Sequence, residues 1–206
     1  MSVRVKICGV TRAEDALTAA AAGADLIGLN FYPPSPRALT IEQACEIRRA
    51  VGERCAAVGV FVNAQRDYIA ERVREVGLDL IQFHGDEDDA ALRGWPIKVI
   101  RALRVGTGAD ESMARLIERG PADYILLDTF DPLLFGGAGR ARPLDELRGL
   151  DLSRVIIAGG LTPASVGAAA AIRPYAVDVA SGVESAPGVK DADKVRSFIA
   201  NAKSSG

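Results

Sequence analysis

The sequence predicts an α/β protein that folds as one (β/α)8 barrel, the TIM barrel, with residues 1–206 as a single domain. Short runs of β-type apolar residues alternate with helical segments eight times, and no change in composition marks a domain boundary. The length of 206 residues lies at the small end of the range of about 200 to 400 residues for this fold. A composition of 49% hydrophobic and 25% charged residues is typical of a globular protein with one substantial core.

Eight apolar runs have the length and composition of buried parallel strands, and the segments between most of them have helical periodicity. The expected strands are Arg4–Cys8, Leu26–Asn30, Ala57–Phe61, Leu80–Phe83, Ile97–Ala102, Tyr124–Asp128, Arg154–Ala158 and Ala176–Ala180. The expected helices are Arg12–Ala22, Ile41–Val51, Arg66–Val76, Ser112–Arg119, Pro163–Ile172 and Asp191–Ala202, with short, weakly specified helical segments near Asp88–Arg93 and Leu144–Leu147.

Residues at the helix ends support these boundaries. Thr11, Thr40 and Thr162-Pro163 stand where helices should begin, because a threonine can cap the first backbone N–H groups and proline suits the first turn. Gly23 and Gly77 stand where helices should stop. A doubly wound open sheet is the structural alternative, but it usually has fewer strands at this length, and no Gly-x-Gly-x-x-Gly follows the first strand.

Charge and composition limit the partners. The net charge of −2 gives no broad basic face, so we expect no nucleic-acid partner. With no apolar run of 18 residues and no signal-peptide pattern, we expect no membrane partner and a cytoplasmic location. Cys8, Cys45 and Cys55 form no Cys-x-x-Cys pair and His84 is the only histidine, which favours reduced thiols and no metal site.

Two reactive side chains end apolar strands far apart in the sequence. Catalytic groups of such barrels come from the carboxyl ends of the strands, where Cys8 and Asp128 both lie, whereas Cys45 and Cys55 fall elsewhere. Cys8 is either a small buried hydrophobe or a functional thiol. Asp128 either caps the following loop or takes part in chemistry.

Glycine turns after strands seven and eight predict an anion site. The turns are Gly159-Gly160 and Ser181-Gly182, at the strand ends where these barrels commonly bind phosphate through backbone N–H groups. Arg37, behind a proline-stiffened loop, is either a surface cation or a clamp for a planar carboxylate. His84 is expected to support the site or contact substrate, and the glycine-rich segment 129–142 is a candidate lid.

Taken together, these motifs resemble the phosphoribosylanthranilate isomerase family of tryptophan biosynthesis over nearly the whole chain. The matching segments are Lys6–Gly9, Gly23–Asp25 with Gly28 and Phe31, Ser35–Arg37, Val58–Asn63, Gln82–Gly85, Leu126–Thr129, Gly159–Pro163 and Val177–Glu184. Each motif is modest alone, and their joint order is specific.

The resemblance implies an Amadori rearrangement of N-(5-phosphoribosyl)anthranilate to 1-(2-carboxyphenylamino)-1-deoxyribulose 5-phosphate, with no cofactor. By that analogy Asp128 is the general acid that protonates the ring oxygen, and Cys8 is the general base that removes the C2′ proton. Arg37 would hold the anthranilate carboxylate. The family usually continues Gly-Gly-Thr-Gly and then Phe-Asp-Trp after strand six, whereas this chain has Gly136-Gly137-Ala138-Gly139 and then Arg140–Leu144, so its lid packing should differ.

Strand parity adds one hypothesis. If Cys8 faces the barrel axis, Lys6 does too, and barrel closure sets it beside Asp178 in a buried ion pair. For Cys8 to act as a base, we expect a thiol pKa below its ordinary value of about 8.5.

Other functions remain open from the sequence. Another phosphosugar barrel, such as indoleglycerol phosphate synthase or a sugar-phosphate epimerase, is one, although its lysine and glutamate groups or its metal ligands are not found. A non-catalytic phosphate-binding barrel or assembly partner is another, because fold alone does not fix function. The partner expected is a small phosphorylated substrate, and the protein is expected to be a monomer or a homodimer.

Overall fold

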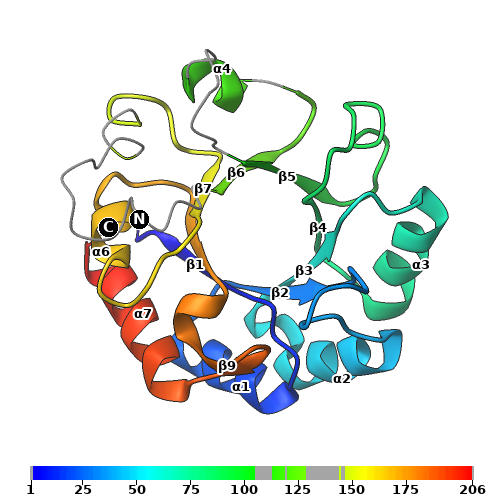
Figure 1. Ribbon diagram of the computed structural model, residues 1–206, viewed down its shortest axis with the longest axis horizontal. Coiled ribbons are helices and arrows are strands. Elements are labelled where there is room, and N and C mark those ends of the chain that lie inside the picture. The colour runs from blue at the N-terminus through cyan, green and yellow to red at the C-terminus, as the bar shows by residue number, and fades with distance from the viewer. Residues whose placement is uncertain (1, 105–112, 119, 129–143, 145–146, 206) are drawn as a thin grey trace.

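The computed structural model describes residues 2–104, 113–118, 120–128, 144 and 147–205. Eight parallel strands, β1 to β8, pair in sequence order and β8 pairs with β1, so the predicted barrel is confirmed (Figure 1). The strands are β1 Arg4–Cys8, β2 Leu26–Asn30, β3 Ala56–Phe61, β4 Leu80–Phe83, β5 Lys98–Arg104, β6 Tyr124–Asp128, β7 Val155–Ala158 and β8 Ala176–Val179. The helices are α1 Ala13–Ala22, α2 Ile41–Val51, α3 Arg66–Val76, α4 Met113–Glu118, α6 Val166–Ala171 and α7 Ala192–Ser205.

Helix ends follow the predictions in part. Thr40 caps α2 with a reciprocal pair of hydrogen bonds to Gln43, and the glycines at 23 and 77 end α1 and α3 with φ values of 97° and 70°. The prediction for Thr11 is wrong, because its hydroxyl donates to the Gly188 carbonyl and Arg12 precedes the helix instead. Thr162 and Pro163 lie in a turn before α6, which begins only at Val166.

Two segments differ from the expected alternation of strands and helices. Residues 84–97 form turns and no helix, so the barrel is covered there by a loop. After β8, a short 3₁₀ helix, Ser181–Val183, leads into an antiparallel hairpin of β9 Glu184–Ala186 and β10 Val189–Lys190. This hairpin was not predicted, because its strands are too short to show a period.

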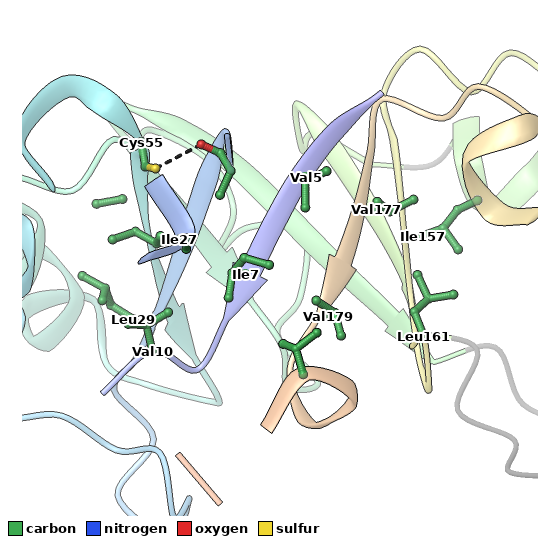
Figure 2. Close-up of a cluster of buried hydrophobic side chains, with 14 of the residues drawn as sticks. Val5, Ile7, Val10, Ile27, Leu29, Cys55, Ile157, Leu161, Val177 and Val179 are labelled. Atoms are coloured by element: carbon green, nitrogen blue, oxygen red, sulfur yellow. Dashed lines mark hydrogen bonds between the residues drawn. The ribbon is translucent and has the colours of Figure 1, made fainter. Parts of the chain in front are cut away.

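The strands bury both faces, as parallel barrels require. The outward face packs against the helices, and Figure 2 shows Val5 and Ile7 of β1 on this face beside Val177 and Val179 of β8. The Cys55 thiol lies in the same layer and donates to the Ala24 carbonyl at 3.1 Å. The inward face forms a second apolar cluster; its buried members are Leu26, Val58, Leu80, Ile100, Ala102, Leu126, Ile156, Ala158 and Ala176.

One ion pair lies inside the barrel. Lys6 and Asp178 are register partners on β1 and β8, and their Nζ and Oδ1 atoms are 2.9 Å apart, which confirms the parity hypothesis. The Lys6 side chain is fully buried and that of Asp178 is 9% exposed. Burial alone would lower the pKa of Lys6, but the nearby charges of Asp178 and Cys8 outweigh it and raise the pKa. The Lys6 ammonium therefore stays charged at neutral pH.

This pair gives a test of stability. Lys6→Met leaves the Asp178 charge buried without a partner and should lower the free energy of unfolding by about 3 to 5 kcal/mol in urea denaturation. Lys6→Met combined with Asp178→Leu removes both charges and should be the more stable of the two variants. A double variant less stable than the single one would show that the pair is not the reason for the loss.

Candidate active site

A cavity of about 440 Å³ opens at the carboxyl ends of the barrel strands. Its lining includes every residue predicted for the site: Cys8, Arg37, His84, Asp128, Gly159, Gly160, Ser181 and Gly182. Cys8 and Asp128 reach it from β1 and β6, which are three places apart around the barrel through β8 and β7. One cavity thus brings together a thiol, a carboxylate, a guanidinium and two glycine turns.

Cys8 faces the barrel interior beside Gly28, its register partner on β2. A Cβ atom at position 28 would lie 2.6 Å from the Cys8 sulfur, so glycine leaves the room that the thiol occupies. Burial raises the pKa of the Cys8 thiol, and the Lys6 ammonium opposes that rise. The expectation of a lowered pKa is therefore wrong, because the loss of water outweighs the nearby cation.

Asp128 and His84 are neighbours in the cavity lining. The His84 Nε2 atom is 3.5 Å from Asp128 Oδ2, and its Nδ1 atom is 2.7 Å from the amide nitrogen of Gln82. Since the Gln82 amide nitrogen can only donate, Nδ1 accepts and Nε2 carries the proton that faces Asp128. Gln82 is fully buried on β4, so it fixes the imidazole ring from inside the barrel.

The loop after β2 brings Arg37 over the end of β1. The Ser35 hydroxyl accepts from the Arg37 backbone N–H at 3.1 Å, and the Asn30 side chain binds both Ser35 and the Tyr32 backbone. A Cβ atom at Gly9, where φ is 67°, would collide with the Arg37 side chain. Gly9 therefore allows the guanidinium to lie beside Cys8.

The two glycine turns stand at the ends of β7 and β8. Gly159 and Gly160 have φ values of 91° and 63°, which glycine adopts readily and other residues rarely do. A Cβ atom at Gly182 would collide with the Leu161 carbonyl oxygen, so the two turns pack backbone against backbone. Since Gly159, Gly160 and Gly182 have no side chains, their main-chain groups line this part of the cavity.

Several lining residues were not assigned a role from the sequence. Asn30 and Tyr32 line the cavity, and Glu184 and Lys190 lie behind Arg37. Glu184 belongs to a motif that was recognised, whereas Lys190 has no local sequence signal because the hairpin alone brings it to the site. The candidate lid, 129–142, lies outside the described residues.

Comparison with known proteins identifies the family. The family model described as N-(5'phosphoribosyl)anthranilate (PRA) isomerase matches residues 5–201. The chain belongs to this family. It is 51% identical over 200 residues to the N-(5'-phosphoribosyl)anthranilate isomerase of Azotobacter vinelandii, and the match covers 96% of each chain. The other phosphosugar barrels considered from the sequence are thereby set aside.

Solved structures of this family have the same fold. A phosphoribosyl anthranilate isomerase in complex with reduced 1-(o-carboxyphenylamino)-1-deoxyribulose 5-phosphate superposes with a TM-score of 0.80 at 40% identity, covering 98% of this chain and 99% of that one. Monomers of the dimeric isomerase from Thermotoga maritima superpose with a TM-score of 0.79 at 38% identity, covering 98% of each chain.

In the described part of the chain, no cluster of three or more histidine, cysteine, aspartate or glutamate side chains could hold a metal ion. None of the helices in that part is both long and apolar enough to cross a membrane.

Proposed function

We propose that this cavity converts N-(5-phosphoribosyl)anthranilate into 1-(2-carboxyphenylamino)-1-deoxyribulose 5-phosphate by general acid–base catalysis, a step of tryptophan biosynthesis. The observation that carries the proposal is that Cys8 and Asp128 line one cavity from separate sides of the barrel. An acid and a base so placed suit a reaction that delivers a proton to one atom of a sugar and removes one from another.

The steps follow from these two groups. Asp128 gives a proton to the furanose ring oxygen while the nitrogen lone pair expels it, which opens the ring to a protonated Schiff base. The Cys8 thiolate then removes the C2′ proton, and those electrons move to the nitrogen to form an enolamine. Transfer of the C2′ hydroxyl proton to C1′ gives the ketone product. Atoms are conserved throughout, because the reaction is an isomerisation.

Binding groups flank this centre. We infer that the backbone of Gly159, Gly160, Ser181 and Gly182 holds the phosphate, since both turns line the cavity at strand ends seven and eight. Arg37 would take the anthranilate carboxylate, and His84 would hold Asp128 in place through its Nε2–H. The substrate would then span the cavity between an anion site and a guanidinium.

Loss of anthranilate fluorescence tests the proposed reaction. Purified protein mixed with freshly made N-(5-phosphoribosyl)anthranilate should remove the fluorescence in a protein-dependent manner, with one ketone product by mass spectrometry. Heat-denatured protein is the control. A loss of fluorescence no faster than in that control would reject the proposal.

The raised pKa of Cys8 predicts the pH dependence of the rate. Only the thiolate can accept a proton, and below the thiol pKa its fraction grows about tenfold per pH unit. Since burial raises that pKa, kcat/KM should still be rising between about pH 7 and 9. The rate of Cys8 alkylation by iodoacetamide, corrected with a Cys8→Ser variant, should rise over the same range. A plateau in both below about pH 7 would contradict this assignment of the base.

We also propose that the chain forms a single domain that works in the cytoplasm as a monomer or homodimer. A dimeric relative supports the second possibility. Light scattering of the purified protein would distinguish the two states.

A further inference from the structure

Behind Arg37 runs a chain of five alternating charges: Arg37, Glu184, Lys190, Asp15 and Arg12. The Arg37 guanidinium donates to both Glu184 oxygens at 2.8 and 2.6 Å, and Lys190 Nζ donates to Glu184 Oε1 at 2.8 Å. The backbone N–H of Lys190 donates to the Asp15 carboxylate at 3.1 Å. The Arg12 guanidinium donates to both oxygens of that carboxylate at 2.9 and 2.7 Å. We call these five residues the charge chain.

Glu184 restricts how Arg37 can meet a ligand. The Nε–H and one N–H of Nη2 are bound to the Glu184 carboxylate, so two of the five guanidinium N–H groups are used. Of the remaining three, one N–H of Nη1 and the second N–H of Nη2 point along the terminal edge, and the other N–H of Nη1 points toward the Cδ side. Because the fork is planar and rigid, holding one edge also fixes the direction of the other.

Lys190 keeps the carboxylate from cancelling the charge of Arg37. The Lys190 side chain is 1% exposed and that of Glu184 is 6% exposed, so water screens this pair little. Lys190 Nζ also donates to the Ala180 carbonyl at 3.1 Å. Burial alone would raise the pKa of Glu184, but hydrogen bonds from Arg37 and Lys190 outweigh it and lower the pKa. Burial lowers the pKa of Lys190, and the hydrogen bond to Glu184 and the charge of Glu184 oppose that fall. With Lys190 protonated, the three groups together carry one net positive charge, which favours an anion at the exposed edge.

We propose that Glu184 is a positioning residue that directs the terminal edge of Arg37 at the carboxylate of the substrate, with Lys190 as its buried counter-ion. The inference rests on the proposed function, since it takes the carboxylate as the ligand of Arg37. It makes Glu184 and Lys190 determinants of specificity for a carboxylated aromatic amine, although neither needs to touch the substrate.

The Glu184→Gln variant tests this role. An amide keeps the size of the side chain but places an NH2 group opposite one of the two Arg37 N–H donors. One of the two hydrogen bonds that hold the guanidinium is therefore lost. The dissociation constant of reduced 1-(o-carboxyphenylamino)-1-deoxyribulose 5-phosphate should rise about 10- to 100-fold. That of the same analogue without its carboxylate should change less than about twofold, because the phosphate and sugar contacts remain. In turnover, KM should rise more than kcat falls.

Three comparisons keep the test specific. Asp193→Asn makes the same chemical change in an exposed ion pair with Arg196 and should leave both dissociation constants unchanged. Glu184→Asp retains the charge and should restore part of the preference for the carboxylated analogue. Binding of the analogue without a carboxylate also reports that Glu184→Gln is folded, with Lys190→Met as a second variant if it is not.

Arg37→Gln separates this inference from the proposed function. If Arg37→Gln leaves the preference for the carboxylated analogue intact, Arg37 is not the carboxylate ligand and both ideas are overturned. If Arg37→Gln abolishes that preference while neither Glu184→Gln nor Lys190→Met reduces it, the positioning role alone is overturned. Tighter binding of the carboxylated analogue by Glu184→Gln would also overturn it, because Glu184 would then compete with the ligand for Arg37.

Discussion

Replacing Cys8 with serine should lower kcat by about 10²- to 10⁴-fold in the fluorescence assay, which is the range lost when a general base is removed. A serine hydroxyl fits the space beside Gly28, but it ionises far less readily than a thiol and cannot accept the C2′ proton near neutral pH. Binding of the reduced product analogue should change little, since the phosphate turns and Arg37 are untouched. The loss therefore belongs to kcat rather than to KM.

Cys45→Ser is the matched control for this variant. Cys45 lies on α2, away from the cavity, and its thiol donates to the Glu75 carbonyl at 3.4 Å, a bond that a serine hydroxyl can also make. It should retain the activity of the unchanged protein. A Cys8→Ser variant with more than about a tenth of that activity would remove Cys8 from the mechanism.

Replacing Asp128 with asparagine should lower kcat by a similar factor of about 10² to 10⁴, because the amide has no proton to give to the ring oxygen. The amide has the size of the carboxylate, so the side chain still fits beside His84. Asp151→Asn is a suitable control, since Asp151 is exposed and caps the Ser153 backbone N–H with an oxygen that the amide keeps.

The two variants should fail at different steps. Asp128→Asn should leave the ring closed, whereas Cys8→Ser should still open it and stop before removal of the C2′ proton. Exchange of the C2′ hydrogen with deuterated water, followed by mass spectrometry, requires both steps, so neither variant should catalyse it. Exchange at the rate of the unchanged protein in Asp128→Asn would contradict the role of the acid.

Much of the fold could be predicted because parallel strands are buried on both faces and read as apolar runs. All eight strands were found, with boundaries that differ by at most two residues, such as β5 ending at Arg104 rather than Ala102. The predicted start of α1 is wrong because the Thr11 hydroxyl donates to the Gly188 carbonyl, 177 positions away, which no local pattern can show. The β9–β10 hairpin was missed because its strands, of three and two residues, are too short to show a period.

Part of the candidate site could likewise be predicted from the sequence, and part could not. Cys8, Asp128 and the glycine turns could be located from the sequence because each directly follows or ends a strand, and a barrel gathers those positions at one rim. Lys6 and Asp178 followed from strand parity. The direction in which the pKa of Cys8 shifts could not be predicted, because it depends on how much water the folded barrel removes from the thiol.

Lys190 shows a further limit of sequence analysis. It is a charged residue in a polar stretch and would ordinarily be exposed, yet the hairpin buries it against Glu184. Its effect on Arg37 passes through Glu184, which is hydrogen-bonded to both side chains. Only the folded arrangement relates these residues to substrate recognition.

The structure of this protein with reduced 1-(o-carboxyphenylamino)-1-deoxyribulose 5-phosphate bound tests the acid–base assignment most directly. The account predicts the Cys8 sulfur about 3 to 4 Å from C2′ of the analogue and the Asp128 carboxylate on the other side of the sugar-derived chain. The phosphate should lie on the turns at Gly160 and Ser181. A complex in which the analogue fills the cavity but C2′ faces away from Cys8, with another side chain in contact, would contradict it.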